Sequence, residues 1–145
     1  METTLLIADD DFALKEVCQD YLTRCGFRVF TASNGIECLS ILRQESPAVM
    51  VVAVDLLWGG ADGLMDFLRE ESQRRMVPEL ILTGNAAEEN VAALRKQSCA
   101  LRYLRKPFLM AKLLHCVRGI VSELPSNVRV ASPSTVRRVR ELCTI

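Results

Sequence analysis

Histidine is almost absent from the sequence, and the cysteines are not arranged to form a metal site without it. His115 is the only histidine, and the six cysteines are scattered singly, with no CxxC pair. Zinc-type sites take Cys and His ligands at short, paired spacings. The pattern therefore argues against a thiolate metal site, and we expect the cysteines to be reduced residues that pack as small hydrophobes.

The sequence also lacks an excess of charge, a long apolar run and a basic leader. Eighteen Lys and Arg balance eighteen Asp and Glu, so the net charge gives no reason to expect nucleic-acid binding. The longest apolar runs, such as 48–57 with Asp55 inside it, are too short to span a membrane. No basic segment precedes an apolar block near Met1, so we expect no secretory signal and a cytoplasmic protein.

The length and composition that remain are those of one globular domain. The chain has 145 residues, of which 50% are hydrophobic and 25% charged, enough for one core and a short appendage. We predict a domain over residues 1–122 and a C-terminal extension over 123–145. The extension reads as a linker and a short basic helix that begins at Ser132-Pro133. It is too short for an output domain.

Segments typical of strands and of helices alternate along the chain. Gly26 suits the end of the first helix, and Asn34 suits the start of the second. The predicted strands are 4–8, 27–32, 48–54, 78–83 and 101–104, and the predicted helices begin near Phe12, Asn34, Leu64, Ala86 and Met110. Five strands that alternate with five helices predict an α/β fold, a flavodoxin-like (βα)5 doubly wound sandwich. Its parallel sheet should have the order 2-1-3-4-5.

Polar residues follow four of the predicted strands, at the edge where such folds bind ligands. They are Asp9, Asp10, Asp55, Thr83 and Lys106. Three neighbouring carboxylates repel one another unless a cation relieves them, and Mg²⁺ (or Mn²⁺) prefers such oxygen ligands. Asp55 ends the central strand, where a carboxylate can attack phosphorus. A lysine and a hydroxyl beside it can bind the transferred phosphoryl group.

These residues lie in motifs that together resemble a known family. The motifs are Leu5-Leu6-Ile7-Ala8-Asp9-Asp10-Asp11, Asp55 with Asp62-Gly63-Leu64, Leu80-Ile81-Leu82-Thr83-Gly84, and Tyr103-Leu104-Arg105-Lys106-Pro107-Phe108. In this order and spacing they resemble the receiver domain of bacterial two-component response regulators, over residues 4 to about 122. The resemblance implies a stand-alone receiver with the fold predicted above.

The resemblance also implies roles for the acidic residues. Asp55 would be the phosphoacceptor and would take its phosphoryl group from a histidine kinase or a histidine phosphotransfer protein. Asp10 would bind the metal directly, and Asp9 would bind it through water. Asp55 and the backbone carbonyl of Leu57 would complete the protein's share of the metal shell.

Further roles fall on residues after the fourth and fifth strands. Thr83 would be the switch hydroxyl that turns toward the phosphoryl group, and Tyr103 the aromatic residue that changes rotamer with it. Lys106 would contact the phosphoryl oxygens. The bond between Lys106 and Pro107 is expected to be cis, as is usual in the family.

The function implied is a phosphorylation-dependent signalling switch of a two-component system or phosphorelay. Such a chain assists its own phosphorylation and dephosphorylation without being a dedicated enzyme. Its output would pass to another protein through the surface of helix 86–97, strand 101–104 and helix 110–121. We expect no direct contact with nucleic acid or membrane, and a homodimer stays an alternative.

Three positions depart from the family pattern. Gly59 replaces a common proline, and Gly84 replaces the common alanine after the switch hydroxyl, so we expect looser loops at both places. Leu57 offers no polar side chain to hold an attacking water, which predicts slow self-dephosphorylation, although Asn85 could counter it. We read Asp11 as an acid that favours the start of its helix and not as a metal ligand.

Other functions stay open at this point. A phosphohydrolase with an aspartyl nucleophile would need a second acid two residues after it, where this chain has Leu57. A phosphate-independent receiver-like binding module would not need the acidic pair, Thr83 and Lys106. The chain could also be the receiver part of a longer regulator.

Overall fold

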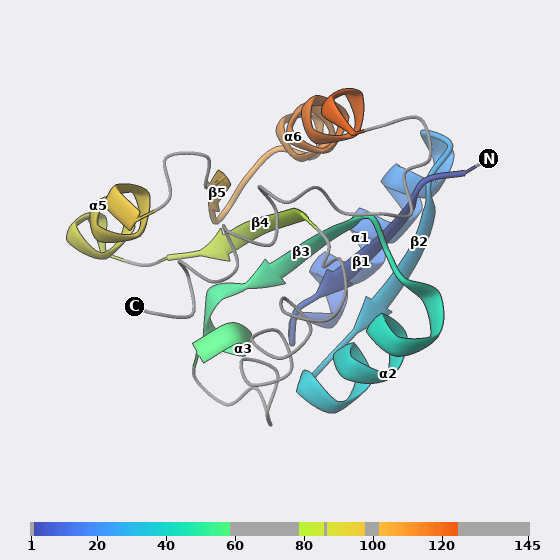
Figure 1. Cartoon of the computed structure of the whole chain (residues 1–145), viewed down its shortest axis with the longest axis horizontal. Coiled ribbons are helices and arrows are strands. Elements are labelled where there is room, and N and C mark those ends of the chain that lie inside the picture. The colour runs from blue at the N-terminus through green and yellow to red at the C-terminus, as the bar shows by residue number, and fades with distance from the viewer. Residues whose placement is uncertain (1, 59–78, 86, 98–101, 125–145) are drawn as a thin grey trace.

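The strands pair in parallel into one sheet whose order is β2-β1-β3-β4-β5, as the sequence predicts (Figure 1). The computed structural model describes residues 2–58, 79–85, 87–97 and 102–124. Its elements are β1 Thr4–Ala8, α1 Phe12–Arg24, β2 Arg28–Ala32, α2 Gly35–Glu45, β3 Val49–Ala53, α3 Val54–Trp58, β4 Glu79–Gly84, α5 Glu88–Gln97, β5 Arg102–Arg105 and α6 Met110–Glu123. The helix predicted near Leu64 and the extension after Leu124 lie outside the described residues.

The core is split into two apolar layers because successive residues of a strand point to opposite faces of the sheet. In β1, Leu6 and Ala8 pack with α2 residues on one face. Leu5 and Ile7 pack with α1 and α6 residues on the other face. All five residues of β3 are buried, as expected of a central strand with cover on both sides.

The helix boundaries follow from local capping chemistry. The side chain of Asn34 accepts a hydrogen bond from the Glu37 amide and begins α2, the capping role that the sequence predicts. Helix α1 ends at Arg24, and Gly26 follows with φ of 99°, a backbone conformation that glycine adopts without steric cost. No helix within the described ranges is long and apolar enough to cross a membrane.

The end of β3 differs from the sequence prediction. Strand 48–54 was expected to carry Asp55 at its tip, but β3 stops at Ala53 and Val54–Trp58 forms a short helix, α3. The β3–β4 ladder ends at the pair Ala53 and Thr83. Beyond that pair no described strand pairs with the residues that follow β3, and their backbone polar groups find partners within a helical turn.

The described cysteines are free thiols, in line with the prediction of reduced residues. They are Cys18, Cys25, Cys38 and Cys116. Burial raises the pKa of the Cys38 thiol to about 12. It also raises the pKa of Cys18 to about 11, with a smaller upward effect from Asp9.

These thiols predict a loss of stability at alkaline pH. In the unfolded chain Cys38 ionises near its usual pKa of 9.0, whereas in the folded protein the thiol stays neutral up to a higher pH. The stability that this thiol contributes is therefore fully present below pH 9.0 and is lost as the pH rises toward 12. At pH 10.5 we expect the loss to reach about 2 kcal/mol. Denaturant unfolding of wild type and Cys38→Ala at pH 8 and 10.5 measures it. Cys38→Ala should lose less stability than wild type, and Cys116→Ala, at a half-buried site, is the control. Equal losses in all three would contradict the prediction.

Candidate functional site

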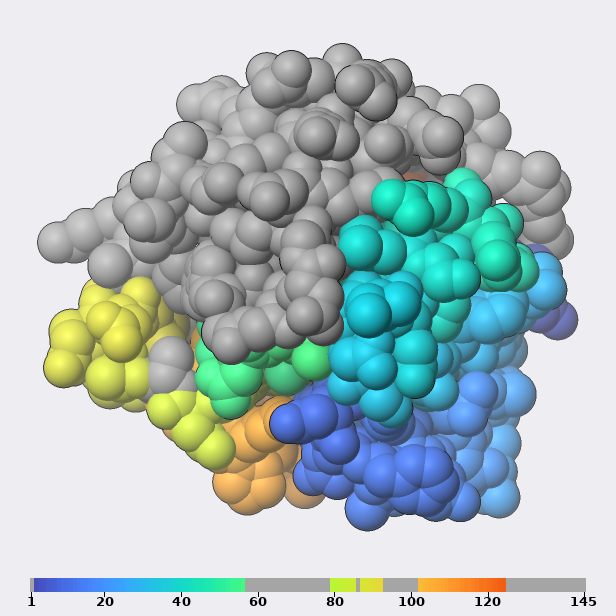
Figure 2. Space-filling model, turned by 90° about the horizontal axis from the view of Figure 1, so that it is seen from below, coloured from blue at the N-terminus to red at the C-terminus, as the bar shows by residue number. Residues whose placement is uncertain are grey.

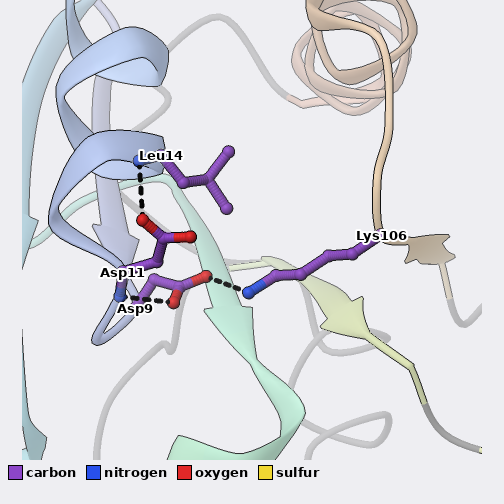
Figure 3. Close-up of polar contacts among 4 residues, drawn as sticks. All are labelled: Asp9, Asp11, Leu14 and Lys106. Atoms are coloured by element: carbon purple, nitrogen blue, oxygen red, sulfur yellow. Dashed lines mark hydrogen bonds and ion pairs between the residues drawn. The ribbon is translucent and has the colours of Figure 1, made fainter.

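Asp9 is the buried centre of the polar site at the carboxyl end of β1. The residue is 2% exposed, and its amide donates to the Ala32 carbonyl at 3.0 Å. Its Oδ1 accepts a hydrogen bond from the Asp11 amide at 2.9 Å, and its Oδ2 accepts one from Lys106 Nζ at 2.7 Å (Figure 3). Both carboxylate oxygens are therefore engaged inside the protein, and charge-assisted bonds of this kind are the stronger ones.

The two acids that follow Asp9 have different surroundings. Asp11 caps α1, because its Oδ1 accepts from the Leu14 amide at 3.0 Å (Figure 3), and the prediction that it serves the helix start is confirmed. Asp10 is exposed and makes no hydrogen bond or ion pair within the described part of the chain. Of the three, Asp10 is therefore the carboxylate with both oxygens available to a ligand, whereas Asp11 is exposed but uses one oxygen in the cap.

Lys106 reaches Asp9 from the edge strand β5, across the carboxyl ends of the strands between them. It follows β5 directly, and its amide donates to the Gly84 carbonyl at 3.0 Å. The Lys106–Pro107 bond is cis, the geometry that the family resemblance implied. The lysine side chain is 24% exposed and that of Asp9 only 4%. The ammonium thus keeps some solvent, whereas the Asp9 carboxylate depends on protein partners for its solvation.

The ends of β3 and β4 lie between these two residues. In the sheet order, β3 and β4 separate β1 from β5, so a contact between Lys106 and Asp9 passes across the ends of both strands. Thr83 is 1% exposed near the end of β4 and pairs with Ala53 of β3. In Figure 2 the first residues of α1, in dark blue, lie beside the green residues that follow β3 and the orange residues near the end of β5.

Asp55 lies on α3, next to this group, and is exposed. Within the described residues, no three His, Cys, Asp or Glu side chains come together as a metal site. The donor types fit a hard cation, since Asp10 offers free carboxylate oxygens and Leu57 a backbone carbonyl in α3. The structure therefore joins Asp9 and Lys106 directly, but within the described residues it does not gather Asp9, Asp10 and Asp55 into one group that could hold a metal ion.

Lys15 is a buried neighbour of the site that the sequence pattern does not single out. It lies on α1 and is only 5% exposed, which is rare for a lysine. Its Nζ donates to the Ser33 hydroxyl, at the start of the loop between β2 and α2. The ammonium ties this loop to α1 beside Asp9. The sequence signal for its burial is helical spacing. Lys15 lies on the same face of α1 as Cys18 and Leu22, the other two buried residues of that helix.

The family match covers most of the chain. The model of the response regulator receiver domain matches residues 5–118, which include Asp9, Asp10, Asp55, Thr83 and Lys106. The chain belongs to the response regulator receiver domain family. It is thus a receiver domain of the two-component response regulators, a class of signalling domains.

Curated relatives share this part of their sequence with the chain. It is 30% identical over 125 residues to the regulatory protein VirG of Agrobacterium tumefaciens (strain 15955), covering 86% of this chain and 46% of that protein. A VirG protein of Rhizobium rhizogenes is also 30% identical over 125 residues, covering 86% of this chain and 51% of that protein. The chain spans about half the length of these relatives.

Solved structures agree with the fold. A response regulator from Thermotoga maritima superposes with a TM-score of 0.68 at 20% identity, over 85% of this chain and 100% of that one. A CheY-like receiver domain protein from Methanospirillum hungatei gives a TM-score of 0.69 at 20% identity, over 85% and 96% of the two chains. At this identity the likeness shows the doubly wound fold alone.

Proposed function

We propose that the chain is a phosphorylation-driven signalling switch that accepts a phosphoryl group on Asp55. The observation that carries the proposal is the Lys106–Asp9 contact at 2.7 Å. This contact places the Lys106 ammonium and the buried Asp9 carboxylate on either side of the ends of β3 and β4. Asp55 lies just after the end of β3, and Thr83 lies near the end of β4. A phosphoryl group bound to Asp55 would meet positive charge there, as phosphoryl transfer requires.

The reaction follows from the side chains. A carboxylate oxygen of Asp55 forms the new bond to phosphorus, and the bond from phosphorus to the donor's leaving group breaks. The product is an acyl phosphate, and the leaving group, an imidazole nitrogen in a histidine donor, keeps the bonding electrons. Lys106 then exchanges Asp9 Oδ2 for a phosphoryl oxygen, and Thr83 donates its hydroxyl to another.

A divalent cation completes the proposed site. Asp10 would bind Mg²⁺ (or Mn²⁺) directly and Asp9 through water, together with Asp55 and the Leu57 carbonyl. Asp9 suits the indirect role because both of its oxygens already accept hydrogen bonds. When bound, the cation would neutralise charge on the phosphoryl oxygens. Its ligand shell needs Asp55 to approach the acidic pair.

Receiver domains interact with histidine kinases and with downstream partners. For this chain we propose a histidine kinase or phosphotransfer protein as donor and an output surface formed by α5, β5 and α6. Ion pairs tie these elements together: Arg105 bonds Glu88 of α5 at 2.9 Å, and Arg102 bonds Glu123 of α6 at 3.4 Å. A homodimer through this surface is an alternative. The cytoplasmic location and the lack of nucleic-acid contact remain predictions.

A specific observation favours the reading as the receiver part of a longer regulator. The VirG relatives are about twice as long as the matched segment, so in those proteins a segment of this kind is one part of a longer chain. The alternative is a stand-alone switch whose residues 123–145 form a basic extension. Both readings use the same phosphoacceptor site.

Intact-mass analysis tests the proposal. The protein is incubated with acetyl phosphate, with and without Mg²⁺, and its mass is followed over time. We expect one phosphoryl adduct that needs Mg²⁺ and is removed by hydroxylamine, which cleaves acyl phosphates. Because Leu57 offers no polar group to hold water, the adduct should decay slowly once the donor is removed. No adduct from acetyl phosphate or from a phosphorylated histidine donor would sink the proposal.

A further inference from the structure

Gly84 and Tyr103 meet at the end of β4, in the middle of the proposed switch. Gly84 follows Thr83 directly, pairs with Arg105 of β5, and accepts a hydrogen bond from the Lys106 amide. Tyr103 lies on β5 opposite Leu82 and packs, partly buried, against the core layer that contains Val54. The two residues thus connect the proposed phosphoryl site with the edge strand of the sheet.

The space beside Gly84 is already filled. A Cβ atom built on Gly84 would lie 3.1 Å from Val54 Cγ1 and 3.3 Å from the Tyr103 hydroxyl oxygen. Gly84 is itself buried, with φ of 153°, a conformation that side chains rarely adopt. Gly84 is therefore a packed position, and a side chain at residue 84 would press against both the Tyr103 hydroxyl and Val54.

Tyr103 also lies near an arginine of its own strand. The Arg105 guanidinium lies 5.8 Å from the centre of the Tyr103 ring, within the range of cation–π attraction. The same guanidinium bonds Glu88 in the first turn of α5 at 2.9 Å. The ring therefore contacts the core layer and also an arginine that is bonded to α5, and both contacts favour the position beside Gly84.

We propose that Gly84 is a positioning residue that lets Tyr103 occupy the place beside Gly84 and Val54, its inward place, before any phosphoryl group arrives. The position of Tyr103 does not depend on the proposed function, but its effect on signalling rests on that function. If Asp55 is the acceptor, phosphorylation finds Tyr103 already inward, and the β5 surface changes less than it would with alanine at position 84. Glycine at this position would thus make the output surface less dependent on phosphate.

Fluorine NMR on protein labelled with 3-fluorotyrosine measures this directly. The sequence has two tyrosines, Tyr21 and Tyr103, so Tyr103→Phe assigns both signals, and Tyr21 on α1 is an internal control. We expect the wild-type Tyr103 signal to move little after acetyl phosphate treatment. In Gly84→Ala it should move in the absence of phosphate and respond more to phosphorylation than in wild type. A wild-type signal that responds as strongly as the variant's would overturn the proposal.

A double-mutant cycle separates the tyrosine contact from backbone strain. Alanine at φ of 153° is strained in any background, so Gly84→Ala alone should lower the unfolding midpoint. In the Tyr103→Phe background the same change should lower it less, since the atom 3.3 Å from the new methyl is gone. An equal cost in both backgrounds would assign the whole effect to the backbone and contradict the proposed contact.

One arm needs neither a foldable variant nor phosphorylation. In unphosphorylated wild type, nuclear Overhauser contacts should join the Tyr103 ring to a Val54 methyl group and the Gly84 Hα atoms. Their absence would overturn the inward position even if Asp55 accepts phosphate. Conversely, their presence in a protein that takes no phosphate would leave this placement standing while the proposed function fails.

Discussion

Asparagine in place of Asp55 is expected to abolish the phosphoryl adduct while leaving the fold intact. The carboxamide matches the carboxylate in shape but lacks the anionic oxygen that forms the bond to phosphorus. Asp55 is exposed on α3, and exposed substitutions of this kind change the free energy of unfolding by about 0.5 kcal/mol or less. Intact-mass analysis after acetyl phosphate and Mg²⁺ should therefore show no adduct in Asp55→Asn at any time point.

The matched control for that loss is Asp20→Asn. Asp20 is an exposed aspartate of α1, paired with Arg24 at 3.3 Å, and its neutralisation changes the net charge equally without touching the site. We expect wild-type phosphorylation in the control. Asp10→Asn should fall between the two, with an adduct that needs far more Mg²⁺. An adduct on Asp55→Asn in wild-type yield would place the acceptor at another residue.

The contact between Asp9 and Lys106 shows what the sequence could predict about the site. The residues are 97 positions apart in the chain, yet each directly follows a strand. In a parallel sheet the carboxyl ends of the strands share one edge, so the strand order alone places the two side chains on the same side. The sequence does not reveal that Lys106 bonds Asp9 and not another acid, because this choice depends on which of the acids is buried.

Three features depend on tertiary structure and were not predicted. Lysine in a helix is usually solvated, and the burial of Lys15 depends on a loop whose Ser33 lies against α1. Helix α3 begins because the β3–β4 ladder stops at Ala53 and Thr83, a ladder length that apolar periodicity does not set. Gly84 was read as a loosening residue, since the sequence does not show that Tyr103 fills the space beside it.

Replacing Lys106 with methionine should impair both phosphorylation and stability, because the lysine serves two partners. Methionine keeps an unbranched stem but removes the charge that would stabilise the phosphoryl oxygens. Loss of one such donor slows comparable reactions by about 100-fold or more, so phosphorylation by acetyl phosphate should slow to that extent. The variant also leaves the Asp9 carboxylate, 4% exposed, without its cation. Leaving a buried group unsatisfied costs about 1–3 kcal/mol.

Combining Lys106→Met with Asp9→Asn separates these two effects. The amide at position 9 removes the buried charge while its oxygen can still accept the Asp11 amide hydrogen bond, so the double variant should regain part of the lost unfolding free energy. Phosphorylation should stay slow, because the charge near the phosphoryl group is still missing. Lys112→Met, at an exposed position on α6, is the control for the loss of a lysine. A double variant no more stable than Lys106→Met alone would show that Lys106 does not stabilise the buried Asp9 carboxylate. Wild-type phosphorylation rates in Lys106→Met would remove the lysine from the proposed chemistry.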